Sequence, residues 1–266
     1  MKKLPWEGSF EPLRIFGNLF FVGTPPASVH IVDTGEGLIM LDTGYQQSLY
    51  QVVDNIYRLG LDLHDLKYIL LTHGHIDHMG AAKAIRELTG AKIALGKEDR
   101  EYANGTLDLS YAKELEMEFR ETFEPDILLT DGDEIRLGST TVRAVATPGH
   151  TPGAMSYFFH VTDGKDTFMA GLHGGMGINT LCKEFLDEYD LPYSLREDFT
   201  RSMLRINEEK VDIFLGSHMQ HNKTAEKAKR VKEGDRFAFV DPKEWVPYNL
   251  ECIESLVRMV KKENEQ

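Results

Sequence analysis

The sequence is poor in cysteine and has no long hydrophobic run. Only Cys182 and Cys252 occur among 266 residues, too few for a disulfide scaffold or a thiolate zinc site. No apolar stretch approaches the roughly 20 residues that a membrane-spanning helix needs. In the basic start MKKLPWEGSF, Pro5, Trp6 and Glu7 arrive before an apolar stretch forms. We therefore expect no signal peptide, no membrane association and a cytoplasmic protein.

An excess of positive charge is also missing. The chain has 30 Lys and Arg residues against 43 Asp and Glu, a formal net charge of −13. Sequence-independent nucleic-acid binding depends on clustered Lys and Arg, so we expect no nucleic-acid partner. No proline- or glycine-rich linker divides the chain. We expect a single domain over residues 1–266 that acts on a small molecule, and the sequence leaves the oligomeric state open.

Strand patterns and helical patterns alternate along the chain. Short β-branched and aromatic runs, broken by glycine-containing turns, predict strands near the N-terminus and again after residue 125. Apolar residues at helical spacing predict helices between and after them. The expected strands lie at 13–23, 28–44, 67–72, 126–171 and 212–218, and the expected helices at 48–59, 79–90, 97–123, 195–208 and towards the C-terminus. This order predicts an α/β fold with two mixed sheets packed together and helices on the outer faces.

Histidine is scarce, with 10 residues, yet three fall in the segment HGHIDH. Residues two apart in an extended segment project to the same side, so His73 and His75 can aim at one point, with Asp77 and His78 turned to a neighbouring point. The segment leaves a predicted buried strand and enters a helix, which gives a rigid frame for ligands. Imidazole and carboxylate are suitable ligands for Zn²⁺. We interpret the segment as part of a metal centre and not as a polar loop.

Further ligands are expected at later strand ends, because Zn²⁺ generally takes four ligands and this cluster cannot close two sites alone. His150 follows a predicted strand within TPGHTPG, and His218 follows another within FLGSH. His150 is either a ligand or an exposed turn residue. His221 is either a further ligand or a surface residue at the start of the next helix.

The motifs HGHIDH at 73–78, DTG at 42–44, TPGHTPG at 147–153 and GSH at 216–218 occur in the order seen in the metallo-β-lactamase superfamily. The opening EPLRIFGNLFFVGT and the late FVDPKEW resemble the third subclass of metallo-β-lactamases. This resemblance implies an αβ/βα four-layer sandwich with a dinuclear zinc site at the sheet edges. It assigns the first Zn²⁺ to His73, His75 and His150, and the second to Asp77, His78 and His218.

The sequence departs from this family pattern after the strand TFMAG. Glyoxalase-type and lactonase-type relatives place a metal-bridging aspartate there, and third-subclass lactamases commonly have serines. This chain has Gly171, Leu172 and His173, so the resemblance implies that water or hydroxide alone bridges the metals. His173 is either a contact of the site or substrate, or a structural histidine. Asp42 is either a turn residue or a carboxylate that orients the ligand loop.

We predict a hydrolase with two Zn²⁺ per chain. A metal-bound hydroxide would open a cyclic amide resembling a β-lactam, with Asp77 accepting a hydrogen bond from the hydroxide and relaying its proton. The alternatives are a lactonase or thioesterase on the same centre, and a non-catalytic metal- or small-molecule-binding protein. Residues 176–195 form a loop that either covers a pocket or packs through its aromatic residues, Phe185, Tyr189 and Tyr193.

Overall fold

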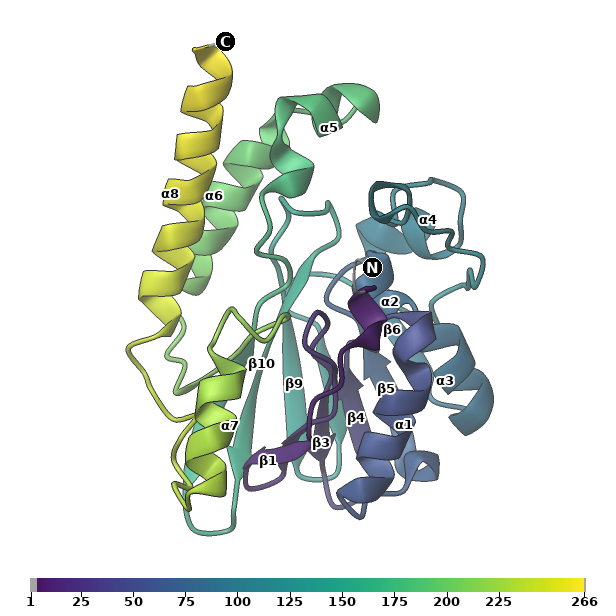
Figure 1. Ribbon diagram of the computed structural model, residues 1–266, viewed down its shortest axis with the longest axis vertical. Helices are drawn as coiled ribbons and strands as arrows, with labels where there is room; N and C mark the ends of the chain where they lie inside the picture. The colour runs from purple at the N-terminus through teal and green to yellow at the C-terminus, as the bar shows by residue number, and fades with distance from the viewer. Residues whose placement is uncertain (1–3, 266) are drawn as a thin grey trace.

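The computed structural model describes residues 4–265 and contains two mixed β-sheets (Figure 1). The first sheet has seven strands in sequence order, antiparallel from β1 to β4 and parallel from β4 to β7. Its strands are β1 (Leu13–Phe16), β2 (Leu19–Phe21), β3 (His30–Asp33), β4 (Leu38–Leu41), β5 (Leu66–Leu70), β6 (Lys92–Gly96) and β7 (Ile127–Leu129).

The second sheet has five strands in the order β12-β11-β10-β9-β8. Strands β8 to β11 are antiparallel neighbours, and β12 joins β11 in parallel. Its strands are β8 (Glu134–Leu137), β9 (Thr140–Ala146), β10 (Met155–Thr162), β11 (Thr167–Leu172) and β12 (Ile213–Leu215). Both sheets are therefore mixed, as the sequence predicts.

The helices differ widely in length, from single turns to the 20-residue α8. The α-helices are α1 (Leu49–Arg58), α2 (Ile76–Met79), α3 (Ala82–Thr89), α4 (Arg100–Ala103), α5 (Lys183–Glu188), α6 (Ser194–Ile206), α7 (Thr224–Lys232) and α8 (Trp245–Asn264). The 3-10 helices are η1 (Pro5–Glu7), η2 (Gln46–Ser48), η3 (Leu63–Asp65), η4 (Lys97–Asp99), η5 (Lys113–Leu115) and η6 (Asn179–Leu181). No helix among residues 4–265 has the length and apolarity needed to cross a membrane.

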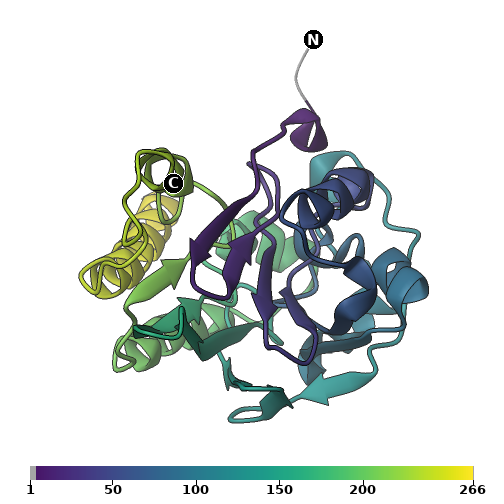
Figure 2. The same cartoon turned by 90° about the horizontal axis from the view of Figure 1, so that it is seen from below.

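Three apolar layers hold the sandwich together. A central core that includes Phe21 and Tyr157 fills the space between the two sheets. The outer face of the first sheet packs against α1 and α3, with Val52 and Ile85 in that core. The outer face of the second sheet packs against α6 and α8, where Trp245 is fully buried. Figure 2, seen from below, shows the strands between these two sets of helices, which confirms the predicted four-layer arrangement.

One helical prediction is wrong. Residues 97–123 contain only η4, α4 and η5, and the rest of the segment is irregular. Helix α4 stops at Ala103 because Asn104 is followed by Gly105, whose φ of +78° lies in the left-handed region. Tyr111 and Glu116 also have positive φ, which a regular right-handed helix does not allow. The charged composition of this segment reflects exposure rather than helix.

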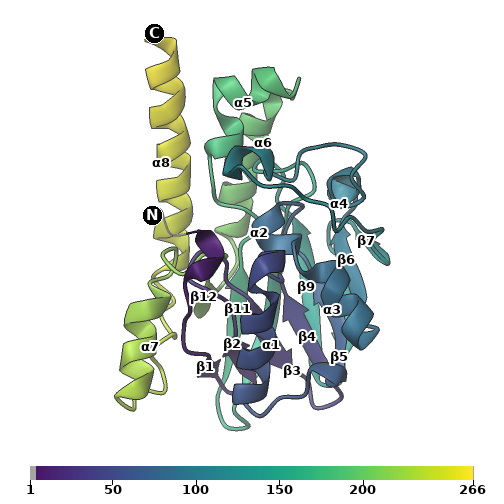
Figure 3. The same ribbon diagram turned by 45° about the vertical axis from the view of Figure 1, so that its right-hand side comes forward.

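The strand ends that carry the predicted ligands lie at one end of the sandwich. Strand β5 leads into His73 and α2 from the first sheet, while β9 leads into His150 and β12 into His218 from the second. Figures 1 and 3 place α2, α4 and α5 at this same end. The fold thus brings distant parts of the chain together above the sheet edges.

Candidate metal centre

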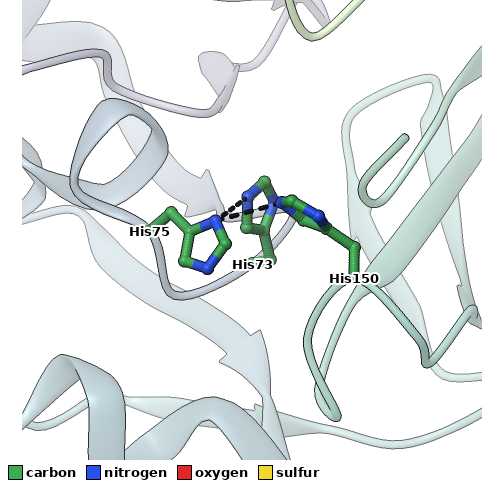
Figure 4. A group of neighbouring side chains, drawn as sticks. All are labelled: His73, His75 and His150. Carbon is green, nitrogen blue, oxygen red and sulfur yellow. Dashed lines mark hydrogen bonds between the residues drawn. The ribbon is translucent and has the colours of Figure 1, made fainter. Parts of the chain in front are cut away.

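Three imidazoles from both sheets converge on one point (Figure 4). His73 Nε2 lies 3.1 Å from His75 Nδ1, which lies 3.0 Å from His150 Nε2. Three nitrogens that bind one Zn²⁺ tetrahedrally at 2.0 to 2.1 Å would lie roughly 3.3 Å apart. The observed spacing therefore fits a single metal ion.

The protonation of this group also fits a metal. Burial lowers the pKa of His73 and of His75 well below the usual range, and neighbouring imidazoles lower both further. Burial lowers the pKa of His150 to about 4. All three rings are therefore neutral at pH 7, and the neutral imidazole is the form that binds a metal ion.

A second group lies beside the first and contains a carboxylate. Asp77 Oδ2 is 3.2 Å from His78 Nε2 and 3.5 Å from His218 Nε2. Although burial by itself raises the pKa of Asp77, His78 and His218 hold it well below its usual range. The rings of His73 and His78, one from each group, have centroids only 4.1 Å apart. The two groups are therefore adjacent, and each has a composition that could hold a metal ion.

Asp42 connects the two groups. This buried residue follows β4 and adopts a φ of +58°. Its carboxylate accepts hydrogen bonds from the Thr72 N–H at 2.7 Å, the Thr72 hydroxyl at 2.9 Å and His78 Nδ1 at 2.8 Å. The Thr72 hydroxyl, 3.0 Å from His73 Nδ1, is then free to accept from that ring. Asp42 thus orients His78 directly and His73 through Thr72, leaving Nε2 of each ring for a metal.

The two later histidines are oriented by backbone carbonyls. His150 Nδ1 donates to Gly177 O at 2.8 Å, and His218 Nδ1 donates to Pro26 O. The glycine-rich segment after β11 packs directly on His150, because a Cβ added at Gly175 would lie 2.6 Å from its Cδ2. By accepting these bonds, the two carbonyls favour the tautomer that carries its proton on Nδ1, which turns Nε2 of both rings towards the ligand groups.

All six residues line one open cavity of about 460 Å³. The other walls come mainly from Tyr45, Tyr111 and Met176, with the polar side chains of Asn179 and Gln220. Tyr111 packs its ring 5.3 Å from that of His75 and has a φ of +63°, a conformation that non-glycine residues rarely adopt. Tyr111 was not among the residues expected at the site, because its neighbours in the chain carry no recognisable motif.

Of the remaining predicted site residues, His221 lines the cavity, whereas His173 and Tyr193 do not. His221 lines the cavity with its ring 4.9 Å from that of His218, but it lies outside both ligand groups. His173 is fully buried beside helix α6, where its Nε2 is 2.9 Å from Met203 Sδ. Tyr193 is exposed and its hydroxyl donates to Asp187. The structure brings neither His173 nor Tyr193 to the cavity.

Comparison with known proteins agrees with this geometry. The family model described as the metallo-beta-lactamase superfamily matches residues 22–164. The crystal structure of BJP-1, a subclass B3 metallo-beta-lactamase of Bradyrhizobium japonicum, is similar with a TM-score of 0.88 and 30% identity, covering 98% of this chain and 97% of that one.

Curated relatives match over shorter stretches. A probable metallo-hydrolase of Burkholderia pseudomallei is 34% identical over 107 residues, which cover 40% of this chain and only 35% of that protein. The hydroxyacylglutathione hydrolase GloC of Haemophilus influenzae is 28% identical over 148 residues, 55% of this chain and 67% of the relative.

Proposed function

Because the chain belongs to the metallo-beta-lactamase superfamily of hydrolases, we propose that it is a zinc-dependent hydrolase that opens a cyclic amide of the β-lactam kind. The observation that carries this proposal is the pair of adjacent three-ligand groups facing one cavity. Three protein ligands on each site leave a coordination position for water or substrate, as in catalytic zinc sites. The likeness in fold over nearly the whole chain to a subclass B3 enzyme supports the amide substrate.

The ligand chemistry supports zinc at both positions. His73, His75 and His150 would hold the first ion, and Asp77, His78 and His218 the second. Neutral imidazole and carboxylate suit Zn²⁺, and a thiolate is not required. When bound, zinc would lower the pKa of a coordinated water molecule towards neutrality and polarise the substrate carbonyl.

Asp77 has a second role in this proposal. Its carboxylate stays ionised because His78 and His218 lower its pKa, and it lines the cavity. An ionised carboxylate there accepts a hydrogen bond from the attacking water and carries the proton towards the leaving nitrogen. Tyr111, Asn179 and Gln220 face the same cavity and would contact the rest of the substrate.

Two measurements on one sample test this proposal. Elemental analysis should find two zinc ions per chain, and a chromogenic cephalosporin should be hydrolysed at a rate that chelation abolishes and added zinc restores. Full zinc loading without turnover of any β-lactam in a panel would contradict the amide substrate while leaving the metal centre in place.

One observation favours a second candidate, hydrolysis of a lactone or thioester. The end of β11 offers no serine for a substrate carboxylate, since Leu172 is buried in the central core and His173 contacts Met203. The similarity to the hydroxyacylglutathione hydrolase GloC is in line with an ester-type substrate. A panel of lactones and thioesters, assayed beside the β-lactams on zinc-loaded protein, separates the two candidates by their kcat/KM values.

A further inference from the structure

Asp99 is a fully buried carboxylate that belongs to neither ligand group. It ends η4 and occupies the N-cap position of α4, where an aspartate ordinarily accepts a hydrogen bond from its own helix. Its side chain makes no such cap bond. The carboxylate is therefore available to another part of the structure.

The Asp99 carboxylate contacts the two loops that carry the first ligand group. Asp99 Oδ2 accepts from the Gly74 N–H at 2.8 Å and from the Thr151 hydroxyl at 2.7 Å. Oδ1 accepts from the Gly153 N–H at 2.7 Å. Gly74 lies between His73 and His75, and Thr151 follows His150. One carboxylate thus joins a ligand loop of the first sheet to a ligand loop of the second.

The backbone around Asp99 is closely packed. A Cβ added at Gly74 would lie 2.8 Å from Tyr102 Cβ, and one at Gly153 would lie 2.4 Å from Asp99 N. A Cβ at Gly96 would lie 1.9 Å from Gly153 O. Glycine at these three positions allows the η4 segment to fit between both ligand loops.

All three partners of the carboxylate are donors. Burial raises the pKa of Asp99 to about 6, and the bonds from Thr151, Gly74 and Gly153 oppose that rise. The carboxylate is therefore ionised at neutral pH and acts only as an acceptor. An amide in its place would direct an NH₂ group at one of the three donors, and that loop would have to move.

We propose that Asp99 is a positioning residue that holds His73 and His75 at the distance from His150 that the first metal site requires. This inference rests on the proposed function only in assuming that the two groups bind zinc. Altering the groups that orient metal ligands typically changes metal affinity by 10- to 100-fold. Since Asp99 contacts neither Asp77, His78 nor His218 in the hydrogen bonds that the structure describes, its effect should be confined to the first site.

Zinc affinity of each site, measured by chelator competition, and the visible spectrum of the cobalt-substituted protein provide the test. Asp99→Asn should weaken the first site at least about tenfold and alter its cobalt spectrum, with the second site unchanged. Thr151→Val removes one donor at nearly constant shape and should weaken the first site several-fold, whereas Thr151→Ser should restore it. Asp212→Asn is the matched control, because Asp212 also accepts a backbone N–H, from Met169, but belongs to neither ligand group and does not line their cavity.

The proposal is overturned if folded Asp99→Asn keeps the zinc affinity and cobalt spectrum of the wild-type chain. If Asp99→Asn fails to fold, the two Thr151 variants provide the test. Equal zinc affinities of the first site in Thr151→Val and Thr151→Ser would contradict the proposal. A wild-type chain that takes up two zinc ions but hydrolyses no substrate contradicts the proposed function alone. A wild-type chain that takes up no metal contradicts both.

Discussion

The imidazole of His78 and the carboxylate of Asp42 are joined by a 2.8 Å hydrogen bond between two buried side chains. Although burial by itself lowers the pKa of His78, the carboxylates of Asp77 and Asp42 raise it to about 10. Without metal, a proton on His78 therefore occupies the position that a cation takes in the second group. Zinc binding there must release this proton, so its affinity should increase with pH.

The role of Asp42 can be tested by Asp42→Asn. Asparagine tolerates the left-handed backbone at this position, so the change removes charge and one acceptor without adding backbone strain. We expect zinc affinity to fall about 10- to 100-fold, with the larger loss at the second site, where His78 lies. Chelator competition measures this affinity, and Asp33→Asn serves as control because the Asp33 carboxylate accepts the Gly35 N–H in a turn and belongs to neither ligand group. Equal affinities of Asp42→Asn and the wild type would show that the contact orients nothing.

Asp77→Asn tests the residue that we assign to both metal binding and proton transfer. The variant should bind one zinc ion in place of two, as counted by native mass spectrometry. The kcat for the best substrate of the panel should fall by about 10² to 10⁴, the usual contribution of a positioned acid or base. Asp62→Asn, which alters an aspartate that caps η3, should leave both quantities unchanged. A variant with two zinc ions and normal kcat would exclude the assigned role.

Gly175→Ala tests whether the segment after β11 sets the position of His150. The new Cβ would lie 2.6 Å from His150 Cδ2, closer than nonbonded carbon atoms approach, so the ring must move. We expect zinc affinity at the first site to fall about tenfold. Gly8→Ala is the control, since its Cβ would meet its nearest neighbour, in Pro25, at 3.4 Å. Unchanged zinc affinity in Gly175→Ala would mean that the backbone around residue 175 moves to accept the new Cβ and that His150 keeps its position.

His173 should make the stability of the protein depend on pH. Burial lowers its pKa in the folded protein to about 3, from 6.5. Below pH 6.5 the unfolded chain therefore binds one more proton than the folded one, so this contribution to stability is lost as pH falls. In His173→Gln this loss disappears. Between about pH 6 and pH 5 the wild type should lose about 1.2 kcal/mol more than the variant in the free energy of unfolding, measured by urea denaturation. Parallel pH profiles of the two proteins would contradict the neutral buried imidazole.

Much of the fold was predictable because its signals are local. Period-two and period-3.6 patterns identify strands such as β9 and helices such as α1 without knowledge of the partner residues. The histidines at 73, 75, 150 and 218 follow the ends of β5, β9 and β12, and the ends of strands that run in the same direction lie at one edge of their sheet. The prediction of helix in 97–123 failed because high charge is shared by exposed helices and exposed loops.

The contacts that complete the site could not be predicted in this way. No motif in the sequence singles out Asp99, and its bonds to Gly74 and Thr151 exist only once both sheets have packed. The same holds for His173, whose place after β11 put it near the site in the sequence while its side chain turned to Met203. Side-chain direction at strand ends depends on packing that sequence patterns do not encode.

The first ligand group takes His73 and His75 from one sheet and His150 from the other, and the second is complete only with His218. During synthesis, a nascent chain that has left the ribosome up to residue 140 therefore contains His73 and His75 but not yet His150, the third member of the first group. If these groups bind zinc, as we propose, tight binding must wait until both halves of the chain have left the ribosome and packed together. The bound ions would then join the two halves, and their retention would distinguish a fully folded chain from an incomplete one.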